Sequence, residues 1–168
     1  AKRDYLDRYD PSWTLERQQK LEQDLHSIAE HRRRLGEVFF FPSGPGVHVQ
    51  GIFGEVGFTQ FAYYLADYPD LIDELLETHT WDAISWIEHL PPDHGIEAIF
   101  VADDIAFKSG PFLSPVWFAA HYFERFARVM SAYHTRGIKV LFHSDGNLNL
   151  ILDGLVAAGL DGLNPIEV

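Results

Sequence analysis

The sequence predicts an α/β fold on a parallel sheet, and more narrowly a partial arc of about four βα units of a parallel (β/α)8 TIM barrel. Short apolar runs alternate with helically periodic segments in the order strand, helix, strand, helix, strand, helix, strand. The runs are continuously apolar, which is typical of strands covered on both faces of a sheet. Polar residues follow directly after several runs, where barrel enzymes carry their chemistry. A doubly wound open sheet is the alternative, although it usually concentrates its site at one switch point.

The chain length predicts one domain, which spans residues 1–168. A domain typically has about 150 residues, and a chain with 46% hydrophobic residues can bury a sizeable core. Four strands cannot close an eight-stranded barrel, which typically takes about 250 residues. We therefore expect this domain to be part of a longer barrel.

The first helix and the first strand are predicted within residues 10–46. Asp10 and Pro11 can begin a helix, because a proline in the first turn has no N–H to leave unsatisfied. Leucines and an isoleucine at spacings of four and three continue the helix to Gly36. Residues 38–41, Val-Phe-Phe-Phe, then predict a strand buried on both faces, ended by a segment rich in proline and glycine.

The middle of the chain is predicted to form a loop, a helix and a strand. Gly51 and Gly54 indicate a long loop. Over residues 68–90, apolar residues at helical spacing predict one long or broken helix, stopped by two consecutive prolines. Residues 96–101 predict a second strand, which runs directly into a pair of aspartates.

The last third of the chain has the clearest element signals. Ser114 is a typical N-cap, a proline follows it, and Gly137 suits a left-handed C-cap, so a helix of about six turns is expected between them. The remaining predicted elements are a strand over 138–142, a helix over 148–158 and a strand starting at 162–164.

Charge and composition exclude several classes of function. The net charge is −12, and because the first 35 residues carry +1, the rest carries −13. Such a surface repels phosphate and anionic lipid, so we expect neither a nucleic-acid nor a membrane partner. The chain has no cysteine, so any metal chemistry must use His, Asp or Glu. No apolar run reaches about 18 residues and no signal-peptide core is apparent, which predicts a cytoplasmic location.

His143 and Asp145 follow the third predicted strand and are the leading candidates for metal ligands. Residues two apart on a strand point to the same side, and at a strand-to-loop break they can converge on one ion. Alternatively, Asp145 and the two residues after it form an ordinary turn and helix cap, while His143 only fills space at the mouth of the barrel.

Asp103 and Asp104 follow the second predicted strand. Adjacent strand residues point in opposite directions, so only one of them should enter a site at this edge. That carboxylate could accept a proton, hold a substrate cation or join a metal shell, and the other would serve as a cap. We therefore predict catalytic roles among Asp103, Asp104 and His143.

Glu167 lies after the last predicted strand and is a candidate third metal ligand, although a solvated loop acid explains it equally well. Four other polar residues near strand ends or in loops are predicted to bind substrate: Glu55, Lys108, Asn147 and Asn164.

Four segments resemble the uroporphyrinogen decarboxylase superfamily. They are Asp-Asp-Ile-Ala-Phe-Lys-Ser-Gly at 103–110, Leu-Ser-Pro at 113–115, Val-Leu-Phe-His-Ser-Asp-Gly-Asn at 140–147, and Gly-Leu-Asp-Gly-Leu-Asn-Pro at 159–165. The resemblance extends over 100–168, with a fainter match over 49–76. It implies a (β/α)8 barrel, because this superfamily comprises barrels such as the haem-pathway decarboxylase and corrinoid-dependent methyltransferases.

Residues 143–147 look more like the methyltransferase branch. In that branch a His-x-Cys pair at this strand end binds zinc, which activates a thiol or another methyl acceptor. Asp145 stands here where the branch has Cys. A carboxylate oxygen is an accepted zinc ligand at about 2.0–2.2 Å and also suits harder metals, so the resemblance implies zinc or another divalent metal.

The implied function is metal-assisted methyl transfer between a small methylated compound or thiol and a corrinoid carried by a partner protein. A second copy of this chain, in a homodimer, is a further candidate partner. One alternative is cofactor-free decarboxylation of uroporphyrinogen or a related acid, although a chain this acidic is a poor host for eight carboxylates. A second alternative is a non-catalytic barrel with a degraded site, suggested by the presence of Asp145 where the methyltransferase branch has Cys.

Overall fold

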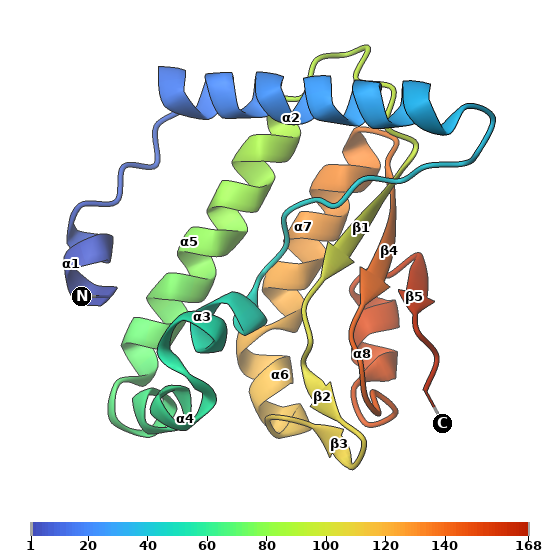
Figure 1. Cartoon of the computed structure of the whole chain (residues 1–168). Coiled ribbons are helices and arrows are strands. Elements are labelled where there is room, and N and C mark those ends of the chain that lie inside the picture. The colour runs from blue at the N-terminus through green and yellow to red at the C-terminus, as the bar shows by residue number, and fades with distance from the viewer. Residues whose placement is uncertain (1, 168) are drawn as a thin grey trace.

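A computed structural model describes residues 2–167. A small parallel sheet and a short antiparallel hairpin lie among helices (Figure 1). The elements in chain order are α1 (Lys2–Asp7), α2 (Leu15–Leu35), α3 (Val49–Val56), α4 (Phe58–Asp67), α5 (Pro69–Glu88), β1 (Ala98–Ala102), β2 (Ala106–Phe107), β3 (Gly110–Pro111), α6 (Pro115–His121), α7 (Phe123–Thr135), β4 (Lys139–His143), α8 (Leu152–Ala157) and β5 (Gly162–Asn164).

The sheet has the strand order β1-β4-β5, and both pairings are parallel, as the sequence predicted for these three segments. Ala102 lies opposite His143, and His143 lies opposite Asn164, so all three strands end at the same edge. Alternate residues of β1 and β4 are fully buried, among them Ile99 and Phe142. The sheet therefore brings the polar residues that follow β1 and β4 to one edge.

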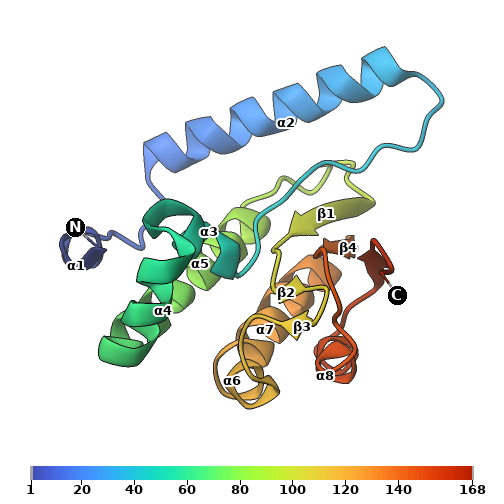
Figure 2. The ribbon, with the colours of Figure 1, turned by 60° about the horizontal axis from the view of Figure 1, so that its bottom comes forward.

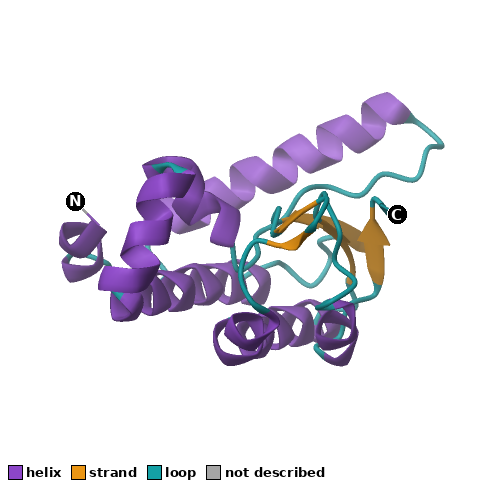
Figure 3. Cartoon of the chain, turned by 90° about the horizontal axis from the view of Figure 1, so that it is seen from below, coloured by secondary structure: helices purple, strands orange, loops and turns teal. Residues whose placement is uncertain are grey.

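Helices α6, α7 and α8 lie on one side of the sheet, and α2 crosses on the other side (Figure 2). Phe126 of α7 packs edge-on against Phe142 of β4, with ring centroids 5.2 Å apart. Leu21 is the one buried residue of α2, all of which lies within the described residues. Viewed from below, the strands lie together near the C-terminus (Figure 3).

The predicted barrel arc is wrong. The described residues form a mixed α/β structure with eight helices, a three-stranded parallel sheet and a two-stranded antiparallel hairpin, not a succession of βα units. An arc requires each strand to be followed by a helix and then by a neighbouring parallel strand. Instead, α3, α4 and α5 follow one another without a strand, and the hairpin interrupts the crossover from β1 to β4.

The strand predicted over residues 38–41 does not form. The chain first meets the sheet at Ser43, in a single parallel bridge to Phe100. There the Phe100 N–H donates to the Pro42 carbonyl oxygen at 2.7 Å, and the Gly44 N–H donates to the Phe100 carbonyl oxygen at 2.9 Å. A proline offers no N–H, so pairing cannot continue through Pro42. The apolar run lies before this point and has no strand partner.

Other element predictions also change in the structure. The helix predicted to begin at Asp10 and Pro11 begins at Leu15, after Thr14, whose side chain caps it. Residues around Gly51 and Gly54 form α3 rather than a loop. The helix predicted between Ser114 and Gly137 is divided at Tyr122, whose φ of −110° departs from helical geometry, into α6 and α7. The helix predicted from residue 148 begins only at residue 152, because the preceding residues form turns.

Within the described residues, no helix combines the length and apolarity needed to cross a lipid bilayer.

Candidate metal centre

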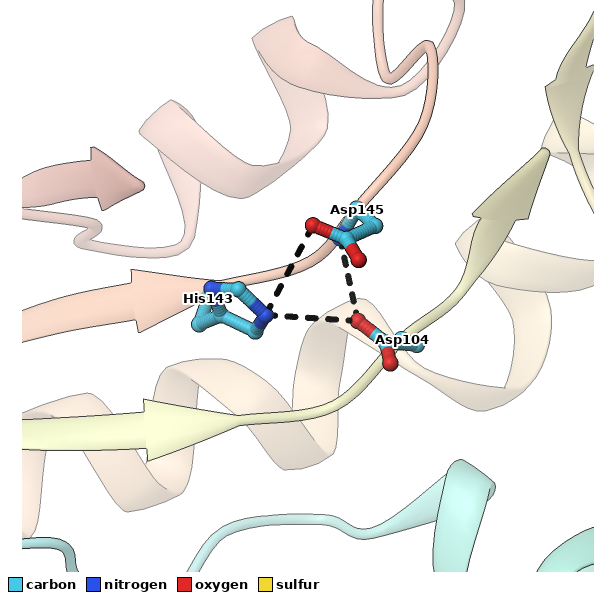
Figure 4. A group of neighbouring side chains, drawn as sticks. All are labelled: Asp104, His143 and Asp145. Atoms are coloured by element: carbon cyan, nitrogen blue, oxygen red, sulfur yellow. Dashed lines mark hydrogen bonds and ion pairs between the residues drawn. The ribbon is translucent and has the colours of Figure 1, made fainter. Parts of the chain in front are cut away.

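Three side chains meet at the carboxyl ends of β1 and β4: Asp104, His143 and Asp145 (Figure 4). His143 Nε2 lies 3.6 Å from Asp104 Oδ1 and 3.8 Å from Asp145 Oδ1. One nitrogen or oxygen from each residue lies within 4.8 Å of the other two. The parallel pairing of β1 with β4 produces this convergence, because it brings Asp104 to the same edge as His143 and Asp145, which follow it by 39 and 41 positions.

The two separations from His143 are close to those between ligands of a single divalent ion. Ligand atoms about 2.1 Å from one tetrahedral zinc lie ~3.4 Å from one another. The two distances from His143 exceed this value by only a few tenths of an ångström, and all three ligand atoms lie within 4.8 Å of one another. The His143 and Asp104 side chains are 25% and 30% exposed, and Asp145 is 65% exposed. The cluster is therefore open to an ion from solvent.

His143 also contacts Asn164 of β5, with Nδ1 lying 3.1 Å from Asn164 Oδ1. With a proton on Nδ1, the imidazole would donate to this amide oxygen and offer the lone pair of Nε2 to an ion. Nε2 is the atom that faces the two aspartates. Histidine ligands of metals are usually held in this way, by a hydrogen bond from the second ring nitrogen.

Asp104 is held by hydrogen bonds at both oxygens. Oδ2 accepts a hydrogen bond from Gln50 Nε2 at 2.8 Å, and Oδ1 accepts one from the Asp145 backbone N–H at 3.0 Å. The Asp145 N–H also ties the loop after β4 to the segment after β1. A carboxylate oxygen has more than one lone pair, so Oδ1 retains capacity for a further partner.

Asp103 faces the opposite way, as expected for adjacent strand residues, so Asp104 is the one that enters the cluster. Asp103 is buried and accepts hydrogen bonds from the backbone N–H groups of Val49 and Gln50 and from the Tyr122 hydroxyl, at 3.0, 2.7 and 3.1 Å. Burial raises its pKa above the usual 3.8, and these hydrogen bonds oppose that rise. Asp103 thus satisfies the first N–H groups of α3.

The other predicted site residues lie at varying distances from the cluster. Glu167 Oε2 accepts a hydrogen bond from the Gly146 N–H at 3.0 Å, which holds the loop after β4, but Glu167 is not among the three clustered residues. Asn147 Oδ1 accepts from the Asn149 N–H at 3.0 Å, an ordinary turn contact. Lys108 is exposed in the turn between β2 and β3.

Glu55 belongs to a different region, a cavity of about 900 Å³ between α2, α3, α5 and the segment before α3. Its lining includes His48, Trp86 and Phe40 but none of the three cluster residues. His48 precedes α3 and has a φ of 60°, which is uncommon for a residue with a side chain.

Gln50 contacts the cluster through Asp104, although the sequence did not indicate it as a site residue. It lies in a segment predicted as a loop, 54 residues before Asp104. A local pattern could not have marked it, because its role depends on where α3 lies relative to the sheet.

Comparison with protein-family models, curated proteins and solved structures finds no match to this chain.

Proposed function

We propose that this protein is a metal-dependent enzyme that binds a divalent cation through Asp104, His143 and Asp145. The observation that carries the proposal is the convergence of His143 Nε2 with one carboxylate oxygen from each aspartate at the ends of two adjacent parallel strands. Three protein ligands are typical of catalytic zinc sites, which keep a further position for water or substrate.

The ligand set bears on which metals the site would accept. One imidazole nitrogen and two carboxylate oxygens suit zinc, and the carboxylates also suit harder ions such as manganese. The absence of cysteine from the chain removes the soft thiolate ligand that would restrict the site to soft metals.

We further propose methyl transfer between a small methylated compound or thiol and a corrinoid as the reaction. Support comes from the motifs that resemble the uroporphyrinogen decarboxylase superfamily: three of the four contribute to the cluster or to its hydrogen bonds, through Asp104, through His143 with Asp145, and through Asn164. The bound metal would supply Lewis acidity. The chain's own residues hold the ion, orient the imidazole and fix the carboxylates.

Decarboxylation of a polycarboxylate is the weaker proposal. Both aspartates of the cluster and nearby Glu167 are acids, and this side of the molecule would repel a substrate with several carboxylates.

Elemental analysis of the full chain, purified without chelator, tests the metal site. We expect about one divalent ion per chain in the wild type, loss of that ion in His143→Ala, and its retention in Asp145→Cys, because thiolate is also a zinc ligand. His26→Ala is a matched control, since His26 is exposed on α2. Metal content that does not change in His143→Ala would overturn the proposed site.

The reaction is tested by following a labelled methyl group from methylated corrinoid to a panel of small thiols. Transfer that depends on His143 and on added metal supports the proposal. A metal-loaded protein that transfers no methyl group but releases carbon dioxide from a carboxylic substrate would favour the decarboxylase alternative. A protein that binds no metal and has neither activity would favour a non-catalytic role.

A further inference from the structure

Gln50 makes an unusual set of contacts with the two aspartates that follow β1. Its side-chain Nε2 donates to Asp104 Oδ2 at 2.8 Å, and its Oε1 accepts from the Asp104 N–H at 3.3 Å. Its own backbone N–H donates to Asp103 Oδ1 at 2.7 Å. One residue in the first turn of α3 therefore contacts both consecutive carboxylates, in two different ways.

The paired side-chain hydrogen bonds determine both orientations. Because Oε1 accepts from a backbone N–H, the amide nitrogen must face the carboxylate, which is the arrangement observed. The bond from Nε2 directs Asp104 Oδ2 towards α3. The other oxygen, Oδ1, is then left facing His143 Nε2 at 3.6 Å.

We propose that Gln50 is a positioning residue, which acts through Asp104 by presenting Oδ1 to a bound divalent cation. This inference rests on the proposed function, since it requires the cluster to bind metal. Partners that orient a ligand in this way contribute substantially to metal affinity, and their loss typically weakens it by about 10–100-fold.

The side chain of Gln50 is not needed to hold α3 in place. The helix start is anchored by Asp103, which accepts from the backbone N–H groups of Val49 and Gln50. Backbone donors are retained when the side chain is changed. The contact with Asp104 can therefore be removed while the anchoring of α3 is preserved, which makes the two roles separable.

A cobalt titration of the full chain tests the inference. Gln50→Met keeps the length and approximate shape of the side chain but removes both amide hydrogen bonds. We expect its dissociation constant for Co²⁺ to rise by roughly 10–100-fold, with a changed visible absorption spectrum at saturation. Gln60→Met is the matched control, because Gln60 is exposed on α4, and it should bind Co²⁺ as the wild type does.

A double-mutant cycle with Asp104→Asn separates positioning from a merely structural effect. If Gln50 acts through Asp104, then Gln50→Met should weaken Co²⁺ binding strongly in the wild type and little in the Asp104→Asn background. A general loosening of α3 would weaken binding by the same factor in both backgrounds and would overturn the inference. Gln50→Ala, followed together with thermal unfolding, repeats the cycle if the methionine variant unfolds at a lower temperature.

The two proposals fail in distinguishable ways. A wild-type chain that binds no Co²⁺ would overturn the metal site and this inference with it. A wild type that binds Co²⁺ through His143, with unchanged affinity in Gln50→Met and Gln50→Ala, would overturn the role of Gln50 alone.

Discussion

Two apolar runs of this chain have nearly the same composition and opposite surroundings. Residues 140–142, Val-Leu-Phe, lie in β4 between two parallel neighbours, and Phe142 is fully buried against α7. Residues 38–41, Val-Phe-Phe-Phe, lie before the chain reaches the sheet, and Phe39 is 64% exposed. An apolar run thus becomes a buried strand only where its backbone pairs with another strand and its side chains pack against other elements.

The two sides of the sheet also differ in how extensively their helices are packed and bonded. On the α7 side, the α5 and α7 helices are joined by Arg125, which binds Asp73 at 3.0 Å and Glu77 at 3.1 Å. On the other side, α2 contributes one buried residue to the core. We expect the free energy of unfolding to depend mainly on the first side.

Phe142→Ala should have the largest effect. The side chain is fully buried, and its ring packs against Phe126 at a centroid distance of 5.2 Å. Removing it leaves a cavity in the core, and such changes cost about 3–5 kcal/mol in the free energy of unfolding. Urea denaturation measures the cost. A loss below about 1 kcal/mol would show that this side of the sheet is loosely packed.

Gly146→Ala should be next. Gly146 has a φ of +91°, and a Cβ there would lie 2.7 Å from the backbone of Ala106. Backbone strain and this clash together should cost about 2–3 kcal/mol. Gly36 also has positive φ, +68°, but has open space around the added Cβ position. Gly36→Ala should therefore cost only the strain, about 1 kcal/mol, and equal unfolding midpoints for the two variants would contradict the close approach at Gly146.

Asp161→Asn should have a smaller effect that depends on pH. Partial burial opposes ionisation of Asp161, but hydrogen bonds from Lys139, the Val140 N–H and His134 outweigh it and lower its pKa below 3.8. The ionised form therefore stabilises the fold above pH 3.8, and this contribution is lost as the pH falls through the lowered pKa.

At neutral pH, the free energy of unfolding of Asp161→Asn should be about 1 kcal/mol lower than that of the wild type. The difference should shrink steadily below pH 4 in a series of denaturation curves. Asp93→Asn, at an exposed position in the loop after α5, is the control and should follow the wild type. A deficit for Asp161→Asn that stays constant down to pH 3 would show that the carboxylate charge is not what stabilises this contact.

Phe39→Ser should have the smallest effect. Phe39 is mostly exposed, and substitutions at such positions usually change the free energy of unfolding by less than about 0.5 kcal/mol. Comparison with Phe142→Ala in the same denaturation assay is the sharpest test of the difference between the two apolar runs. A loss of 2 kcal/mol or more would mean that residues 38–41 are buried in solution.

Several parts of the fold and site followed from local sequence signals. The three segments that form β1, β4 and β5 were correctly located and correctly predicted to pair in parallel, because short apolar runs that alternate with helical segments indicate parallel strands. His143, Asp145 and one of the two adjacent aspartates were expected at one edge, and the structure brings His143, Asp145 and Asp104 together there. The assignment of metal ligands itself stays a prediction.

Apolar runs and polar strand ends can be located from the sequence, because those signals depend on neighbouring residues. Packing between distant elements leaves residues 38–41 unpaired, gives no barrel arc, and turns Asp104 rather than Asp103 towards His143. The contact of Gln50 with Asp104 also depends on the packing of distant elements. Strand pairing and side-chain contacts between residues far apart in the sequence depend on how whole elements pack, and no local pattern of residues specifies that packing.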